Sequence, residues 1–87
     1  MWEIEFSRQA LKDIALLKVA GLDAKAKTLL EAMRMNPYQN PPPYEKLRGY
    51  NPPQYSRRIN RQHRLLYIVL EERNVVRVLR MWTHYGE

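Results

Sequence analysis

All six prolines of this 87-residue chain fall between Pro37 and Pro53. A proline ring fixes φ and removes the backbone N–H, so such a stretch cannot form a regular helix or a central strand. The prolines therefore separate two parts of the chain whose secondary structure differs. Because about 15 residues without regular structure is long for a compact domain, we interpret residues 37–53 as a functional loop that proline and tyrosine stiffen.

The part before the prolines has the pattern of one strand followed by two short helices. Trp2, Ile4 and Phe6 alternate with glutamates, which is the period of a half-buried strand. Ser7 is placed to cap a first helix, which Gly21 stops, and Asp23 is placed to cap a second. Pro37 prevents the second helix from continuing. The two helices have apolar stripes at Ala10, Leu11, Ile14 and Leu17, and at Ala26, Leu29, Leu30 and Met33.

The part after the prolines has the pattern of three strands. Residues 55–60, 64–70 and 75–83 are rich in β-branched and aromatic side chains, and the polar stretch 71–74 ends in Asn74, as a hairpin connection does. The expected order is β-α-α-β-β-β in one domain over residues 1–87. This is an α+β fold whose antiparallel sheet is covered on one face by the two helices.

Strand alternation predicts which side chains lie on the uncovered face of this sheet. If Leu65, Tyr67 and Val69 point at the helices, Arg64 points to the opposite, open face. In the last strand neither alternating set is purely apolar, so hydrophobicity does not assign its buried side. A bulge or bend near Trp82 would decide which of the two following residues, His84 or Tyr85, faces a cleft.

Composition excludes several classes of protein. There is no cysteine, so disulfides and cysteine-bound zinc are excluded; with two histidines and few acids, we expect no metal site and no cofactor. The three glycines are scattered, so there is no glycine-rich phosphate loop. The longest apolar run, 65–70, is too short to span a membrane, and the N-terminus lacks the pattern of a signal peptide. We expect a soluble cytoplasmic protein.

Positive charge is concentrated in one segment of the chain. Residues 45–64 hold six basic side chains and one acid, a net +5 of the chain's formal +6. Arginine suits bidentate contact with phosphate, and the nearby tyrosines 44, 50 and 55 could stack on unpaired bases. This predicts a polyanionic partner; the alternatives are a solvated basic face or a docking patch for an acidic protein. The six cations are Lys46, Arg48, Arg57, Arg58, Arg61 and Arg64.

A carboxylate, an arginine and an imidazole are sufficient to cleave RNA. The 2′-hydroxyl is an internal nucleophile, so a protein need only remove its proton, stabilise the crowded phosphorus and protonate the leaving 5′-oxygen. Glu45, Arg64 and His84 are the candidate carboxylate, arginine and imidazole. His84 suits the role of acid or base because a free imidazole titrates near neutral pH. Each residue alone also has a structural interpretation. Glu45 could be a salt-bridge partner, Arg64 a solvent-facing strand end and His84 a surface residue at the chain end. We interpret His63 as a structural or edge residue.

Together these segments resemble the YoeB/Txe toxins of bacterial toxin–antitoxin modules, which belong to the RelE-like superfamily. The resemblance covers essentially the whole chain and rests most on a Ser-Arg-Arg-Ile segment followed by a His-Arg-Leu-x-Tyr segment. The matching segments are Tyr44-Glu45-Lys46-Leu47, Tyr55-Ser56-Arg57-Arg58-Ile59-Asn60, His63-Arg64-Leu65-Leu66-Tyr67 and His84-Tyr85. The chain departs from the family at Asn51-Pro52-Pro53-Gln54 and in continuing to Glu87.

The resemblance implies a RelE-like, microbial-RNase-like fold and a ribosome-dependent, metal-independent endoribonuclease that cleaves messenger RNA at the A site. It implies Glu45 as the general base, Arg64 as the stabiliser of the phosphate and His84 as the acid. Tyr85 would help position the substrate. Contacts with phosphate or ribosomal RNA are implied for Lys46, Arg57 and Arg58, and the charge and stacking arguments add Arg48, Arg61 and Tyr55.

The resemblance also implies partners. The expected ones are a cognate antitoxin of the YefM/Axe kind with an acidic character, the ribosome and messenger RNA; a homodimer is a further option, and no membrane is involved. The alternative function is a non-catalytic module that binds RNA or the ribosome through the same basic segment. A DNA-binding role is disfavoured because neither helix is basic enough to serve for recognition.

Overall fold

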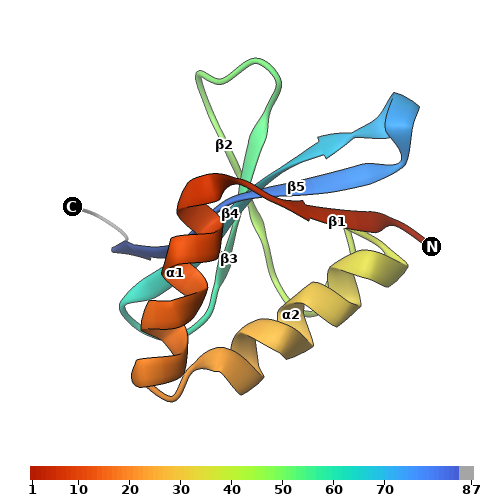
Figure 1. The fold of residues 1–87 in the computed structure, drawn as a ribbon. Coiled ribbons are helices and arrows are strands. Elements are labelled where there is room, and N and C mark those ends of the chain that lie inside the picture. Colours follow the sequence, from red (N-terminus) through yellow and green to blue (C-terminus); the bar gives the residue numbers. More distant parts are fainter. Residues whose placement is uncertain (85–87) are drawn as a thin grey trace.

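Two helices pack against a five-stranded sheet in the computed structural model, which describes residues 1–84, with side chains to residue 83 (Figure 1). None of the helices in this part of the chain is long and apolar enough to cross a membrane. In chain order the elements are β1 (Glu3–Phe6), α1 (Arg8–Val19), α2 (Asp23–Met35), β2 (Glu45–Leu47), β3 (Gln54–Arg58), β4 (His63–Leu70), the 3-10 turn η1 (Glu71–Arg73) and β5 (Val75–His84).

The helices begin and end close to the predicted positions. Ser7 caps α1, because its Oγ accepts a hydrogen bond from the backbone N–H of Ala10 at 3.0 Å. Gly21, with φ of 73°, follows the end of α1, where a left-handed residue suits glycine. The prediction that Asp23 caps α2 was wrong. Asp23 is the first residue of that helix, where its charge favours the helix dipole, and Leu22 occupies the cap without a side-chain hydrogen bond.

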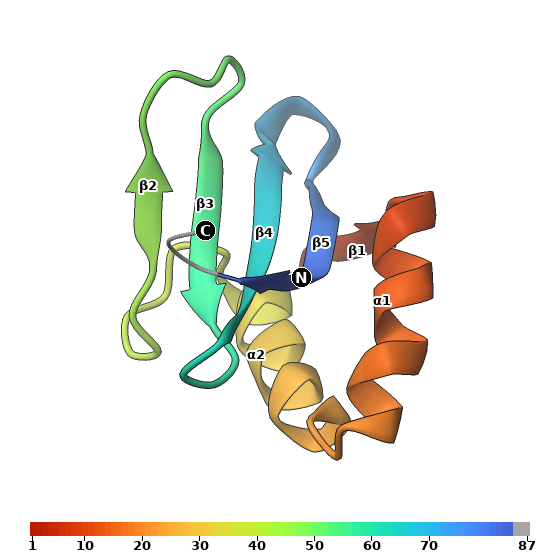
Figure 2. The same cartoon turned by 90° about the vertical axis from the view of Figure 1, so that its left-hand side faces the viewer.

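The sheet confirms the predicted fold class but differs in two details. Its strand order is β1-β5-β4-β3-β2, and Figure 2 shows β2, β3 and β4 side by side with α2 behind them. Strand β1 pairs with β5 in parallel, because the two helices carry the chain across before it returns, so the sheet is mixed. Strand β2 was not predicted. It forms inside the proline-rich stretch because the chain between Pro43 and Pro52 holds no proline.

The core lies between the helices and the covered face of the sheet. Leu65 and Tyr67 of β4 are fully buried there, whereas Arg64 lies on the opposite face, as strand alternation predicted. The buried hydrophobic residues that form this cluster are Ala10, Leu17, Ala26, Leu29, Met33, Ile59, Leu65, Tyr67, Val76, Val78 and Met81.

Strand β5 contains the irregularity expected near Trp82. Tyr67 of β4 pairs with Val78, yet three residues earlier Arg64 pairs with Thr83, and register shifts interrupt the ladder on both sides of Leu66. The backbone of His84 lies opposite His63. The side chain of His84 and all of Tyr85 lie outside the described residues, so the prediction about which of them faces the cleft stays a prediction.

Candidate active site

An open hollow of about 400 Å³ lies over β2, β3 and β4. It is lined by two predicted catalytic residues, one predicted RNA contact and the two residues that precede β2: Glu45 and Arg64, Arg58, and Pro43 and Tyr44. A larger hollow of about 530 Å³ lies between β1 and α2 and contains none of the predicted site residues. The smaller hollow, which contains the predicted catalytic residues, is therefore the candidate active site. Within residues 1–84, no group of three or more histidines and acids is placed to hold a metal ion.

Arg64 is held in place from two sides. Its Nη1 donates to Ser56 Oγ at 3.1 Å and lies 3.4 Å from Glu45 Oε1. The Arg64 side chain is only 11% exposed, whereas that of Glu45 is 48% exposed. An ion pair this exposed contributes little to stability. The arrangement instead presents a preoriented guanidinium beside a carboxylate that a substrate can reach.

Sheet register explains why these groups meet. Glu45 pairs with Ser56, and Ser56 pairs with Leu66, so all three lie on one face. Arg64 precedes Leu66 by two residues and shares that face. Arg58 pairs directly with Arg64, which places two guanidinium groups on neighbouring strands. Like charges opposite each other repel, and a bound phosphate would relieve that repulsion.

The two histidines have different positions. His63 is buried, and its ring stacks on Trp82 with centroids 3.8 Å apart and an interplanar angle of 21°. This agrees with its interpretation as a structural residue. The backbone of His84 lies one position along the ladder from the Arg64–Thr83 pair. The chain end that carries the predicted acid is thus adjacent to the arginine of the hollow.

Arg57 is not available to RNA in this structure, contrary to the prediction. Its side chain is fully buried and donates to the carbonyl oxygens of Pro37 (3.0 Å), Gln39 (2.9 Å) and Pro42, and to Tyr67 Oη (3.2 Å). Its guanidinium also lies 5.0 Å from the centre of the Tyr44 ring. Arg57 therefore ties the proline-rich stretch to the sheet, next to the residue that precedes Glu45.

Tyr55 belongs to a cluster of aromatic rings beneath the same stretch. Its ring centroid lies 5.7 Å from Tyr38, 5.9 Å from Tyr44 and 5.5 Å from Tyr67. The Tyr38 hydroxyl donates to Glu71 at 2.6 Å; burial and this carboxylate raise the pKa of Tyr38. Burial also raises the pKa of Tyr67 to about 12, although Arg57 opposes the shift. Tyr55 as a whole residue is half-buried.

The remaining predicted RNA contacts are exposed. Once the buried Arg57 and the nearly buried Arg64 are set aside, four cations of the basic segment face solvent. Arg58 lines the hollow, Lys46 lies on the strand that carries Glu45, and the other two lie in adjoining turns. The four are Lys46, Arg48, Arg58 and Arg61.

Sequence reasoning missed the residues that support the site from behind. Ser56, which orients Arg64, was quoted only as part of a motif. Asp13 on α1 is fully buried and binds β5. A signal for Asp13 was present: it falls three residues after Ala10 and four before Leu17, on the apolar face of the helix. An acid at such a position is buried only when it is paired.

Comparison with known proteins assigns the family. Residues 6–85 match the model of the YoeB-like toxin of bacterial type II toxin-antitoxin systems. The chain belongs to this toxin family. The match includes every described residue of the hollow, and it confirms the resemblance found in the sequence. A search of curated proteins finds no match.

Solved toxin structures share this fold. The YoeB dimer from Staphylococcus aureus is 30% identical with a TM-score of 0.79, covering 97% of this chain and 98% of that one. The YoeB-YefM complex from the same organism is 31% identical with a TM-score of 0.76, covering 98% of this chain and 99% of that one. A YoeB/ParE toxin from Agrobacterium tumefaciens is 22% identical with a TM-score of 0.83 and shares the fold. The match covers 95% of this chain and 99% of that one.

Proposed function

We propose that this toxin is a ribosome-dependent, metal-independent endoribonuclease that cleaves messenger RNA at the A site and thereby inhibits translation. The observation that carries the proposal is the meeting of Glu45 and Arg64, 3.4 Å apart, in an open hollow that Arg58 also lines. A carboxylate that substrate can reach, beside paired guanidinium groups, suits transfer of a proton next to a phosphodiester.

The reaction needs two proton transfers. Glu45 accepts the proton of the 2′-hydroxyl as that oxygen attacks phosphorus. The bond from phosphorus to the 5′-oxygen then breaks, which leaves a 2′,3′-cyclic phosphate on one product. His84 gives a proton to the departing 5′-oxygen, and Tyr85 positions the substrate. The 48% exposure of the Glu45 side chain supports its role, because the carboxylate can be approached without rearrangement of the sheet.

Arg64 stabilises the negative charge that accumulates on the phosphate oxygens. Ser56 Oγ fixes its guanidinium before substrate binds, so little reorganisation is needed during the reaction. Arg58, its cross-strand neighbour, adds a second positive charge at the same place. Further RNA contacts in this proposal are the exposed Lys46, Arg48 and Arg61 and the half-buried Tyr55. Lys46 and Tyr55 are a cross-strand pair whose side chains alternate with those of Glu45 and Ser56.

We place the toxin in the cytoplasm with a cognate antitoxin of the YefM/Axe kind. The support is the solved YoeB-YefM complex from Staphylococcus aureus, which is 31% identical to this chain, and the exposed basic segment that would attract an acidic partner. The solved YoeB dimer supports a homodimer in the same way. Copurification of the toxin with the neighbouring gene's product at low salt tests the antitoxin partnership.

Three substitutions test the catalytic proposal: Glu45→Gln, Arg64→Ala and His84→Gln. We expect each to relieve growth arrest on induction and to lower cleavage of ribosome-bound messenger RNA at least 100-fold in primer extension, because each removes a group that acts in the transition state. Glu72→Gln is the matched control, since Glu72 is an exposed acid in the β4–β5 connection, and it should cleave as the unaltered toxin does.

Ribosome binding separates the two candidate functions. If all three variants still bind ribosomes and the unaltered toxin never cleaves, the protein is a non-catalytic binding module. If all three variants arrest growth and cleave normally, the site lies elsewhere. Circular dichroism of each variant confirms that the fold is retained.

A further inference from the structure

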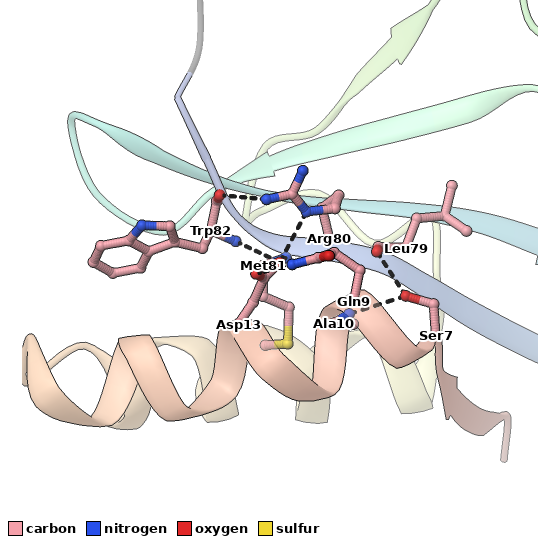
Figure 3. Close-up of polar contacts among 8 residues, drawn as sticks. All are labelled: Ser7, Gln9, Ala10, Asp13, Leu79, Arg80, Met81 and Trp82. Atoms are coloured by element: carbon pink, nitrogen blue, oxygen red, sulfur yellow. Dashed lines mark hydrogen bonds and ion pairs between the residues drawn. The ribbon is translucent and has the colours of Figure 1, made fainter.

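A buried carboxylate on α1 holds the end of the last strand. The Asp13 side chain is fully buried, and Figure 3 shows it facing β5. Its Oδ2 accepts hydrogen bonds from the backbone N–H groups of Met81 (2.9 Å) and Trp82 (3.2 Å) and from Arg80 Nε (3.0 Å). Its Oδ1 accepts from Gln9 at 3.1 Å. These bonds offset the cost of burying a charge.

The hydrogen bonds also keep Asp13 ionised. Burial on its own would raise the pKa of Asp13, but the Met81 N–H, Arg80 and Gln9 outweigh it and lower that pKa below its usual range. An ionised carboxylate accepts strongly from several donors at once. Arg80, which it pairs with, donates in turn to the Trp82 carbonyl oxygen at 3.0 Å, so three consecutive residues of β5 are bound at one place.

These three residues lie where β5 changes register. From the Tyr67–Val78 pair, an unbroken antiparallel ladder would place Met81 opposite Arg64, but the structure places Thr83 there. The two interruptions therefore move the strand end by two residues, about 7 Å at the usual rise. Extra residues in a strand leave backbone N–H groups without a ladder partner, and Asp13 accepts two such groups.

The register decides where His84 lies. With the shift, its backbone is opposite His63 and adjacent to Arg64. Without the shift, the same count would place His84 opposite Arg61, in the turn between β3 and β4 and beyond the paired part of the sheet.

We propose that Asp13 is a positioning residue of the active site, whose carboxylate fixes the bulged register of β5 and so brings His84 beside Arg64. Asp13 does not touch the substrate; it acts through the backbone of residues 81 and 82. The structural part of the inference stands on its own, and its consequence for cleavage rests on the proposed function.

Nuclear Overhauser effects measure the register directly. In the unaltered toxin we expect backbone contacts between Thr83 and Arg64. In Asp13→Ala these contacts should disappear or move to Met81–Arg64, while contacts between Val76 and Val69 remain. Asp13→Asn keeps the shape of the side chain but turns an amide N–H₂ toward a donor, so it should show a weaker form of the same change and serves if the alanine variant does not fold. Asp23→Asn, an exposed acid on the other helix, is the matched control.

Cleavage kinetics distinguish positioning from general stability. Misplacement of the proton donor should lower kcat about 100-fold in Asp13→Asn with KM little changed. A substrate whose leaving 5′-oxygen is replaced by sulfur needs no protonation, so on it the variant should approach the unaltered rate. Glu45→Gln should stay slow on both substrates, because it acts on the nucleophile.

Each outcome decides one claim. If the folded Asp13 variants keep the Thr83–Arg64 contacts, or lose activity equally on both substrates, Asp13 is not a positioning residue. If the unaltered toxin cleaves neither substrate on the ribosome, the proposed function fails, and the backbone contacts alone decide whether Asp13 sets the register.

Discussion

A fully buried arginine must replace its hydration with protein oxygens, and Arg57 does so with three backbone carbonyls and a tyrosine hydroxyl. Removing it leaves those groups without their donor. We therefore expect Arg57→Ala to lower the free energy of unfolding by about 3 kcal/mol in urea denaturation. Arg58→Ala, at the exposed neighbouring position, should change stability by less than about 0.5 kcal/mol. Equal losses in the two variants would contradict a structural role for Arg57.

Tyr67 makes stability depend on alkaline pH. Its pKa in the folded state is raised to about 12, whereas an unfolded tyrosine ionises near pH 10. Between these values the unfolded state binds fewer protons, so the free energy of unfolding falls as pH rises, by at most about 1.4 kcal/mol per pH unit. Urea titrations from pH 9 to 11.5 measure this slope. Tyr67→Phe should flatten it, and an unchanged slope would assign the effect to other groups.

Ser56 affects activity more than stability. Its Oγ lies 3.1 Å from Arg64 Nη1, and without it the guanidinium loses one of the contacts that orient it. Ser56→Ala should lower the rate of messenger RNA cleavage about tenfold, about 1.4 kcal/mol in the transition state, with the unfolding midpoint nearly unchanged. Ser7→Ala is an informative contrast, because loss of the α1 cap should lower stability by about 1 kcal/mol and spare the chemistry.

At the scale of elements, hydrophobic period located most of the fold. Alternation at Trp2, Ile4 and Phe6 and the helical stripes each predicted an element that the structure contains, because burial of one face dominates those segments. Strand β2 was not predicted because its three residues are too few to show an alternation of apolar and polar side chains. The parallel pairing of β1 depends on how the helices cross, which no local pattern reports.

The site was predictable only where chemistry marks its residues. Glu45 and Arg64 stood out as an acid in a basic segment and a charge on an apolar strand, and they meet as expected. Arg57 and Arg58 are alike in sequence, and carbonyls 15 to 20 residues away decide which one is buried. The register of β5 depends on Asp13, 68 residues away, so no local pattern predicts it.

The stability that Asp13 gives to the end of β5 should be lost in acid, because the carboxylate must be ionised to accept its hydrogen bonds. The pKa of Asp13 is lowered in the folded state, so its contribution to stability is present above the unfolded pKa of about 3.9 and is lost as pH falls. Urea unfolding from pH 5.5 to 2.5 should therefore show a steeper loss of stability for the unaltered toxin than for Asp13→Asn. Glu72→Gln, which removes an exposed acid, should follow the unaltered curve. Parallel curves for Asp13→Asn and the unaltered toxin would contradict this account.

At the scale of the whole molecule, the basic segment exposes fewer positive charges than its sequence indicates. Of its six cations, one is buried under the proline-rich stretch and one is held beside Glu45. The other four cations of the segment are exposed, and one of them, Arg58, lines the hollow. Arg58 adjoins the proposed catalytic groups, so the positive charge that attracts RNA would also direct it to the site.

The salt dependence of RNA binding measures how many of these exposed cations contact phosphate. For single-stranded RNA, the slope of log K against log salt changes by about 0.7 for each phosphate contact removed. Titrating a short single-stranded RNA against Arg58→Gln/Arg61→Gln should therefore show a slope shallower by about 1.4 than that of the unaltered toxin. Arg77→Gln is the matched control, because it removes an exposed cation of β5 outside the basic segment and should leave the slope unchanged. Equal slopes for all three proteins would mean that the RNA contacts another face, since the loss of two phosphate contacts is too large a change to be masked.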